Sequence, residues 1–246
     1  MLGVLNRYVK WLHTGWPAGT VEKLPFVRED GTTNVPGVYI VGDLTGIPLL
    51  KFSSDSGARA VDHVNADPTF HKARESSDEA VYDLVIIGGG VSGAAAAMQA
   101  QKMGWRFLVF EANQSFATIK NFPKGKPIYT YPTDMVPAGD LTFNHEVKEP
   151  LVDDLDRQLE ASGIEFVDAR VDVVKRKGGQ LHVHHKAGDR GAKAQSTRAL
   201  RVVVAIGRSG NYRSLGAPGE DLDTVYNRLH DPQEFGGKKV TVVGGG

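Results

Sequence analysis

Cysteine is absent from all 246 residues of the chain. Disulfides, thiolate metal ligands and dithiol exchange are therefore excluded within this chain. No stretch approaches the run of about 18 apolar residues that a membrane-spanning helix needs, so we expect no membrane association. The N-terminus also lacks the apolar core and cleavage site of a secretory signal, which makes a cytoplasmic location the default expectation.

The chain has no excess of positive or negative charge, because its 29 basic residues balance its 29 acidic ones. This balance gives no electrostatic reason to expect nucleic acid as a partner. His182 and His184 project to one face of an expected strand, but the sequence fixes no third ligand beside them. We therefore predict no metal site and interpret these histidines as an exposed strand face.

The stretch "YDLVIIGGGVSGAAAAMQAQKMGWRFLVFEAN", which begins at Tyr82, predicts a strand, a glycine turn, a helix and a second strand. Gly88, Gly90 and Gly93 form the pattern G-x-G-x-x-G. Glu111 follows Gly88 by 23 positions, close to the ~20 that separate the acidic residue from this loop in dinucleotide-binding folds. Together these features predict a βαβ unit that binds a dinucleotide rather than a nucleotide-free Rossmann-like unit.

Each residue of this pattern has a physical task in binding a dinucleotide. Gly88 permits a tight turn, and Gly90 lets the backbone approach a pyrophosphate at the helix N-terminus, where free N–H groups favour negative charge. Gly93 and the alanines after it allow the helix to lie close to the sheet. Glu111 can accept hydrogen bonds from an adenosine ribose. The unit alone does not distinguish FAD from NAD.

Four stretches, "VIIGGGVSGAAAA", "NFPKGKPIYTYPTDM", "VVVAIGRSGNYRSLGAPGED" and "KKVTVVGGG", follow one another between residues 82 and 246. In these stretches the chain resembles the thioredoxin-reductase-like branch of the two-dinucleotide-binding flavoproteins, including bacillithiol-disulfide-reductase-like members. The resemblance implies that the first βαβ unit holds FAD. It also implies that residues 121–123 run near the flavin, that the strand ending at residues 205–207 packs beside the cofactor, and that the backbone near Val171 contacts the adenine.

The N-terminal stretch "NVPGVYIVGDLTG", residues 34–46, is similar to the last FAD motif of that family. Its position is unusual, because it precedes the glycine loop instead of following it. The resemblance implies that Asp43 bonds the ribityl chain of the flavin and that the N-terminus of the next helix points at the flavin. Two interpretations of the order remain open: the segment closes the FAD site of its own chain, or it completes the site of another subunit.

At the other end, "VTVVGGG" is interpreted as the first strand and glycine turn of an NAD(P)H-binding unit that is truncated. We therefore expect an N-terminal segment at 1–63 with the Gly-Asp motif, a polar linker at 64–80, an FAD-binding domain at 81–216, and a crossover into the truncated unit at 217–246. The fold class is α/β: a Rossmann-like FAD-binding domain with a central parallel sheet and a small antiparallel β-meander. A helix near residues 48–62 and one at 150–162, capped by Gly163, are also predicted.

The sequence thus predicts the FAD-binding portion of an NAD(P)H-dependent flavin oxidoreductase, with NAD(P)H implied for the parent protein only. The alternative is a non-catalytic flavin-binding or regulatory module completed by another chain. The electron acceptor is unknown, no catalytic residue is assigned, and a homodimer is possible. The predicted cofactor contacts are Gly42, Asp43, Gly88, Gly90, Val91, Ser92, Gly93, Glu111, Ala112, Asn121, Val171, Ala205 and Gly207.

Overall fold

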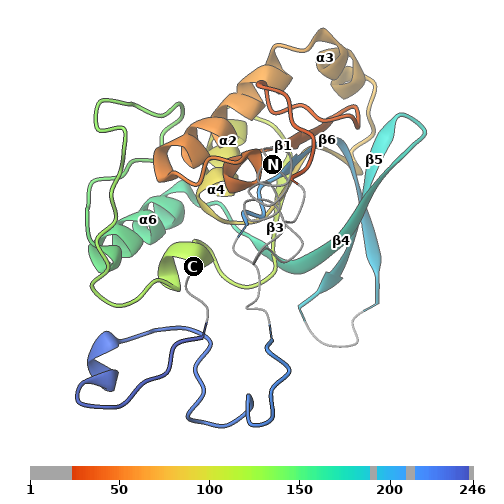
Figure 1. The fold of residues 1–246 in the computed structure, drawn as a ribbon. Coiled ribbons are helices and arrows are strands. Elements are labelled where there is room, and N and C mark those ends of the chain that lie inside the picture. The colour runs from red at the N-terminus through yellow and green to blue at the C-terminus, as the bar shows by residue number, and fades with distance from the viewer. Residues whose placement is uncertain (1–23, 189–192, 209–213, 244–246) are drawn as a thin grey trace, which may run out of the picture.

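The computed structural model describes residues 24–188, 193–208 and 214–243 (Figure 1). Its strands are β1 (Val38–Ile40), β2 (Val81–Ile87), β3 (Phe107–Glu111), β4 (Val167–Lys177), β5 (Gln180–Ala187) and β6 (Gln195–Val204). Its helices are α2 (Leu50–Asn65), α3 (Pro68–Glu75), α4 (Val91–Lys102), α5 (Ala117–Lys120) and α6 (Lys148–Ser162), with short 3₁₀ turns η1 (Gly42–Thr45) and η2 (Pro232–Phe235). No helix in these ranges has the length and apolar character needed to cross a membrane.

The strands form one sheet in the order β1-β6-β2-β3-β4-β5. The pairs β1–β6, β6–β2, β2–β3 and β3–β4 are parallel. The central strand β2 reads "VYDLVII", and all but one of its residues are buried, as expected for a strand covered on both faces. The expected α/β class with a central parallel sheet is therefore confirmed.

The antiparallel part joins the same sheet instead of forming a separate layer. β4 turns into β5 at Gly178 and Gly179, whose positive φ angles of 59° and 81° suit a tight hairpin turn. β5 then pairs antiparallel with β6. Since β6 also pairs with β2, the β-meander and the parallel sheet share β4 and β6.

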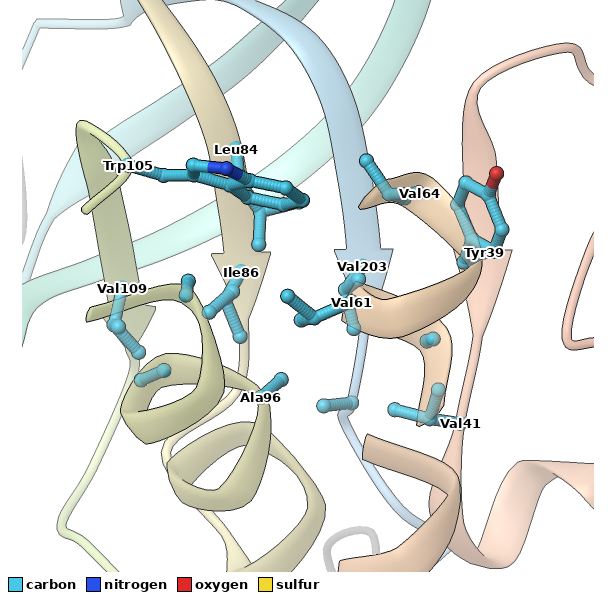
Figure 2. Close-up of a cluster of buried hydrophobic side chains, with 14 of the residues drawn as sticks. Tyr39, Val41, Val61, Val64, Leu84, Ile86, Ala96, Trp105, Val109 and Val203 are labelled. Carbon is cyan, nitrogen blue, oxygen red and sulfur yellow. The ribbon is translucent and has the colours of Figure 1, made fainter. Parts of the chain in front are cut away.

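Helices α2 and α4 lie side by side and cover one face of the parallel sheet (Figure 1). They approach closely at Gly57 of α2, where any Cβ atom would collide with the backbone carbonyl of Ser92. Figure 2 shows the buried cluster beneath them, where Val61 and Val64 of α2 meet Ile86 and Val203 of the sheet. The N-terminal segment is thus built into the same core as the glycine-loop unit.

Helix α6 confirms the helix predicted at residues 150–162. Leu151 and Leu155 are fully buried, and Pro150 lies in the first turn, where its missing N–H costs no helical hydrogen bond. Gly163 ends the helix in the left-handed conformation, with a φ angle of 65°.

Within the polar segment 64–80, which the sequence suggests as a linker, residues 68–75 form the helix α3, for which the sequence shows no pattern. The N-cap of the helix is Asp67, whose side chain accepts a hydrogen bond from the backbone N–H of Thr69. Phe70 is fully buried, and its ring lies 4.6 Å from that of Trp105, measured between ring centroids. A single apolar side chain in a polar segment therefore anchors the helix through a contact distant in sequence.

The strand expected near residues 239–243 is absent, because these described residues have no regular structure. Val240, Val242 and Val243 are exposed. A strand needs a neighbour to pair its backbone groups, and the described residues give this stretch none. Figure 1 shows the blue segment 214–243 extending away from the sheet. The segment contacts the body where the backbone N–H of Lys124 donates to the carbonyl of His230. The glycines at 244–246 lie outside the described residues, as do residues 1–23.

Candidate functional site: a cavity at the carboxyl edge of the sheet

A cavity of about 540 Å³ opens at the carboxyl edge of the parallel strands. The chain after β2 lines it with the glycine loop, and the chain after β6 lines it with residues 205–207. The first residues of α4 and α2 complete this wall. Ligands of open α/β sheets bind in this position, outside the carboxyl ends of the strands.

The glycine loop has the close packing that the sequence predicts. Gly88 has a φ angle of 106°, and a Cβ atom there would lie 2.5 Å from the carbonyl oxygen of Ala205. A Cβ atom on Gly93 would collide with the carbonyl of Gly88. Gly90 differs from both, because a Cβ atom built on it meets no atom within 4 Å. Gly88 and Gly93 are therefore required by the protein's own packing, whereas Gly90 faces open space.

The helix N-termini at the cavity have no side-chain caps. Gly90 is the N-cap of α4 and Leu49 is the N-cap of α2, and neither helix has an acidic residue in its first turn. The first N–H groups of a helix have no partner within it, and the dipole adds a partial positive charge of about half an elementary charge there. The cavity is thus suited to an anionic group.

Glu111, at the end of β3, lies on the cavity wall next to the glycine loop. Its Oε2 accepts a hydrogen bond of 2.6 Å from the backbone N–H of Gly89, and its Oε1 accepts one of 2.8 Å from that of Asn113. The carboxylate therefore holds the loop in shape. The same position allows it to meet a polar group of a ligand in the cavity.

Asp43 lies on the wall of the same cavity as Gly88, although it precedes Gly88 by 45 positions in the sequence. Its carboxylate accepts a hydrogen bond of 2.9 Å from the hydroxyl of Ser53. Gly42 beside it has a φ angle of 72°, and a Cβ atom there would lie 2.6 Å from the Ser92 hydroxyl. This glycine lets η1 lie directly against the start of α4.

The structure therefore brings most of the sequence-predicted contacts together. Those on the cavity wall are Asp43, Gly88, Gly90, Val91, Ser92, Glu111, Ala205 and Gly207. Gly42 and Gly93 pack directly behind the wall. Ala112, Asn121 and Val171 do not line the cavity. Val171 lies on β4 opposite His185 of β5.

Several residues of the wall are not among the predicted contacts, and Phe116 is the most unusual of them. Phe116 lines the cavity with a φ angle of 54°, unusual for a residue with a side chain. Its backbone N–H donates to the carbonyl of Gly89, which ties the segment after β3 to the glycine loop. A positive φ at phenylalanine has no signature in the sequence. Phe122, next to the predicted Asn121, also lines the cavity.

A glycine loop, an uncapped helix N-terminus and an acidic strand end around one cavity are the arrangement of dinucleotide-binding α/β proteins. Comparison with known families agrees: residues 85–246 match the pyridine nucleotide-disulphide oxidoreductase family. The chain belongs to this family. The expected resemblance and the expected class, a portion of a pyridine-nucleotide-linked oxidoreductase, are thereby confirmed.

The chain is also similar to individual proteins. It is 30% identical over 165 residues to a ferredoxin–NADP reductase of Ignicoccus hospitalis, covering 67% of this chain and 49% of that protein. It is 24% identical over 171 residues to the bacilliredoxin reductase Bdr of Bacillus subtilis, and this match covers 65% of this chain and 49% of that protein. The bacillithiol disulfide reductase Bdr of Bacillus cereus has a solved structure with a TM-score of 0.48 and 26% identity, covering 58% of this chain and 44% of that one. The chain spans about half the length of the curated relatives it matches.

Proposed function

We propose that the chain binds one FAD in the cavity and forms the FAD-binding portion of an NAD(P)H-dependent oxidoreductase. The observation that carries this proposal is the convergence of two uncapped helix N-termini, an acidic strand end and an open glycine position on one cavity. Family membership supports FAD over a nucleotide of another kind.

The residues of the cavity fit the parts of FAD in a definite order. The pyrophosphate lies at Gly90, where open space and the free N–H groups of α4 meet. Glu111 accepts a hydrogen bond from the adenosine ribose, and Asp43 holds the ribityl chain. The first turn of α2 and the side chains of Tyr129 and Tyr131 enclose the ring end of the cavity.

When bound, flavin supplies hydride and electron transfer between a reduced pyridine nucleotide and an acceptor, chemistry that belongs to the cofactor. The chain's own residues bind and orient. The α4 N-terminus neutralises part of the pyrophosphate charge, and Leu49, Phe116 and Ile119 supply apolar side chains to the cavity wall. The finer expectations, namely the electron acceptor, the choice of NADH or NADPH, a homodimer and a cytoplasmic location, stay predictions.

The test is a titration of the purified chain, freed of any bound flavin, with FAD, FMN and NAD⁺, followed by flavin fluorescence and calorimetry. We expect one FAD per chain, weaker binding of FMN because it lacks the adenosine arm, and no comparable binding of NAD⁺. Tighter binding of NAD⁺ than of FAD would contradict the proposal. Oxidation of NADH or NADPH by the flavin-loaded chain would separate an enzyme from a non-catalytic flavin-binding module.

A further inference from the structure

Lys51 is a buried cation next to the cavity that the proposed function leaves without a role. It is the second residue of α2, and only 9% of its surface is exposed. Its Nζ donates three hydrogen bonds to backbone carbonyls of one loop: 2.8 Å to Pro132, 3.1 Å to Thr133 and 2.8 Å to Met135. All three donors of the ammonium group are therefore used on a single segment.

The position of this charge is unfavourable for the stability of the helix. A cation in the first turn meets the positive end of the helix dipole, and α2 has no acidic residue in that turn. Lys51 forms no salt bridge with any carboxylate in the described ranges. Burying a charge with only neutral partners is costly. Helix formation therefore does not account for lysine at this position.

The loop that Lys51 holds carries part of the cavity wall. Tyr129 and Tyr131 line the cavity, and their rings stack with 6.0 Å between centroids. Both side chains are mostly exposed, so packing around them does little to fix their place. The loop is also tied to α2 further along, where Asp55 accepts a hydrogen bond of 2.8 Å from the backbone N–H of Ala138.

We propose that Lys51 is a positioning residue of the flavin site. It fixes the loop of residues 131–135 to the first turn of α2 and thereby holds the two tyrosines in the cavity wall. Leu49 and Leu50, its neighbours in that turn, line the same cavity. Lys51 thus couples two walls that are about 80 positions apart in sequence. The inference rests on the proposed function that this cavity holds FAD.

The first experiment needs no flavin. Chymotrypsin cleaves after an accessible Tyr129, so the rate of that cleavage reports how firmly the loop is held. We expect Lys51→Met to speed cleavage by about tenfold or more, the change expected when a hydrogen bond to a charged group is lost. Lys51→Arg, which keeps the charge and the donors, should restore much of the protection. Lys72→Met, at an exposed lysine of α3, is the matched control.

The second experiment uses flavin. We expect Lys51→Met to raise the dissociation constant for FAD by about tenfold, on the same scale. At saturating FAD the visible absorption and circular dichroism of the bound flavin should also change, and Lys51→Arg should return them toward the parent spectrum. A lysine that only stabilised the fold would shift the melting temperature but leave the spectrum of the saturated protein unaltered.

The outcomes separate the two proposals. The positioning role would be overturned if a folded Lys51→Met variant kept both the parent rate of cleavage at Tyr129 and the parent affinity for FAD. Failure of the parent chain to bind FAD would overturn the proposed function, and the flavin part of this inference with it. In that case the cleavage rates, measured without flavin, still decide whether Lys51 holds the loop.

Discussion

A side chain added at Gly90 enters open space at the cavity, whereas one added at Gly93 collides with the carbonyl of Gly88. Two glycines of one loop are therefore fixed by different requirements. The φ angle of Gly90 is −76°, which any residue adopts without strain. Gly90 is thus a position where ligand binding can be changed without changing the fold.

We expect Gly90→Val to abolish FAD binding with little change in thermal unfolding, because the new side chain occupies the space of the pyrophosphate. Gly93→Ala is the contrasting variant and should lower the free energy of unfolding by about 1–3 kcal/mol through overpacking. Flavin titration and chemical denaturation measure the two effects. Full flavin occupancy in folded Gly90→Val would count against the pyrophosphate assignment.

Glu111 gives the second test at a single residue. We expect Glu111→Ala to weaken FAD binding by about 1–3 kcal/mol, the scale for a lost charge-assisted hydrogen bond. Because the carboxylate also accepts from Gly89 and Asn113, Glu111→Gln is needed beside it. The glutamine amide keeps one acceptor oxygen, so the FAD affinity of Glu111→Gln should lie between that of Glu111→Ala and that of the parent chain. An unchanged affinity in Glu111→Ala would remove this residue from the ribose site.

At the level of elements, α3 shows what tertiary contacts add to a weak local pattern. We expect Phe70→Ala to lower the free energy of unfolding by about 3–5 kcal/mol, the scale for removing a fully buried aromatic side chain. Urea denaturation would measure this loss. Lys72→Ala on the exposed side of the same helix should change it by less than about 0.5 kcal/mol. Equal effects of the two substitutions would mean that residues 68–75 behave as a linker after all.

The elements that could be predicted from sequence have strong local signals. α6 has regularly spaced leucines, a proline in its first turn and a glycine at its end, and β2 is a nearly unbroken apolar run. α3 is only eight residues long with one large apolar residue, so its signal is weak. Phe70 is buried in a core cluster that includes Trp105, and nothing in the local sequence shows that contact.

The residues of the candidate site also divide into those with a recognisable pattern in the sequence and those without one. The glycine loop, Glu111 and Asp43 have recognisable spacing, and all of them reach the cavity. Lys51 and Phe116 could not be assigned, since their importance depends on a loop more than 80 positions away and on an unusual backbone angle. Val171 was placed by resemblance alone, and the structure puts it on β4 outside the cavity wall.

For the molecule as a whole, the order of the segments matters less than their packing. β1 extends the sheet beside β6, and α2 packs on α4, so the described part of the N-terminal segment lines the cavity of the same chain. The proposal that residues 30–62 close the FAD site in their own chain has this packing as its support. In the rival proposal, the N-terminal segment completes the FAD site of another subunit, so it would have to reach the cavity of a neighbouring copy.

We expect deletion of residues 1–62 to lower FAD affinity sharply, because it removes one wall of the cavity and uncovers α4. Asp43→Ala should weaken binding more mildly, since the wall itself remains. Titration at several protein concentrations distinguishes the two proposals: affinity independent of protein concentration supports closure within one chain. Parent-like affinity in the deletion variant would contradict both.

The closed pairing of β6, β2, β3, β4 and β5 has a consequence for aggregation. Each of these strands has a neighbour on both sides along part of its length. β4 pairs with β3 only at Val167 and Asp168, so its residues 169–177 are an edge of the sheet, as is the three-residue β1. The outer side of β1 is itself occupied, because Thr32 bridges to Tyr39 and Ile40 donates to the carbonyl of Gly31. Exposed strand edges are the usual templates for fibril growth. The open edge of β4 carries the charged residues Arg170, Asp172, Lys175, Arg176 and Lys177, and charges on a strand edge oppose pairing with a second copy. We therefore expect folded copies of this chain to resist cross-β assembly through the charge of this edge.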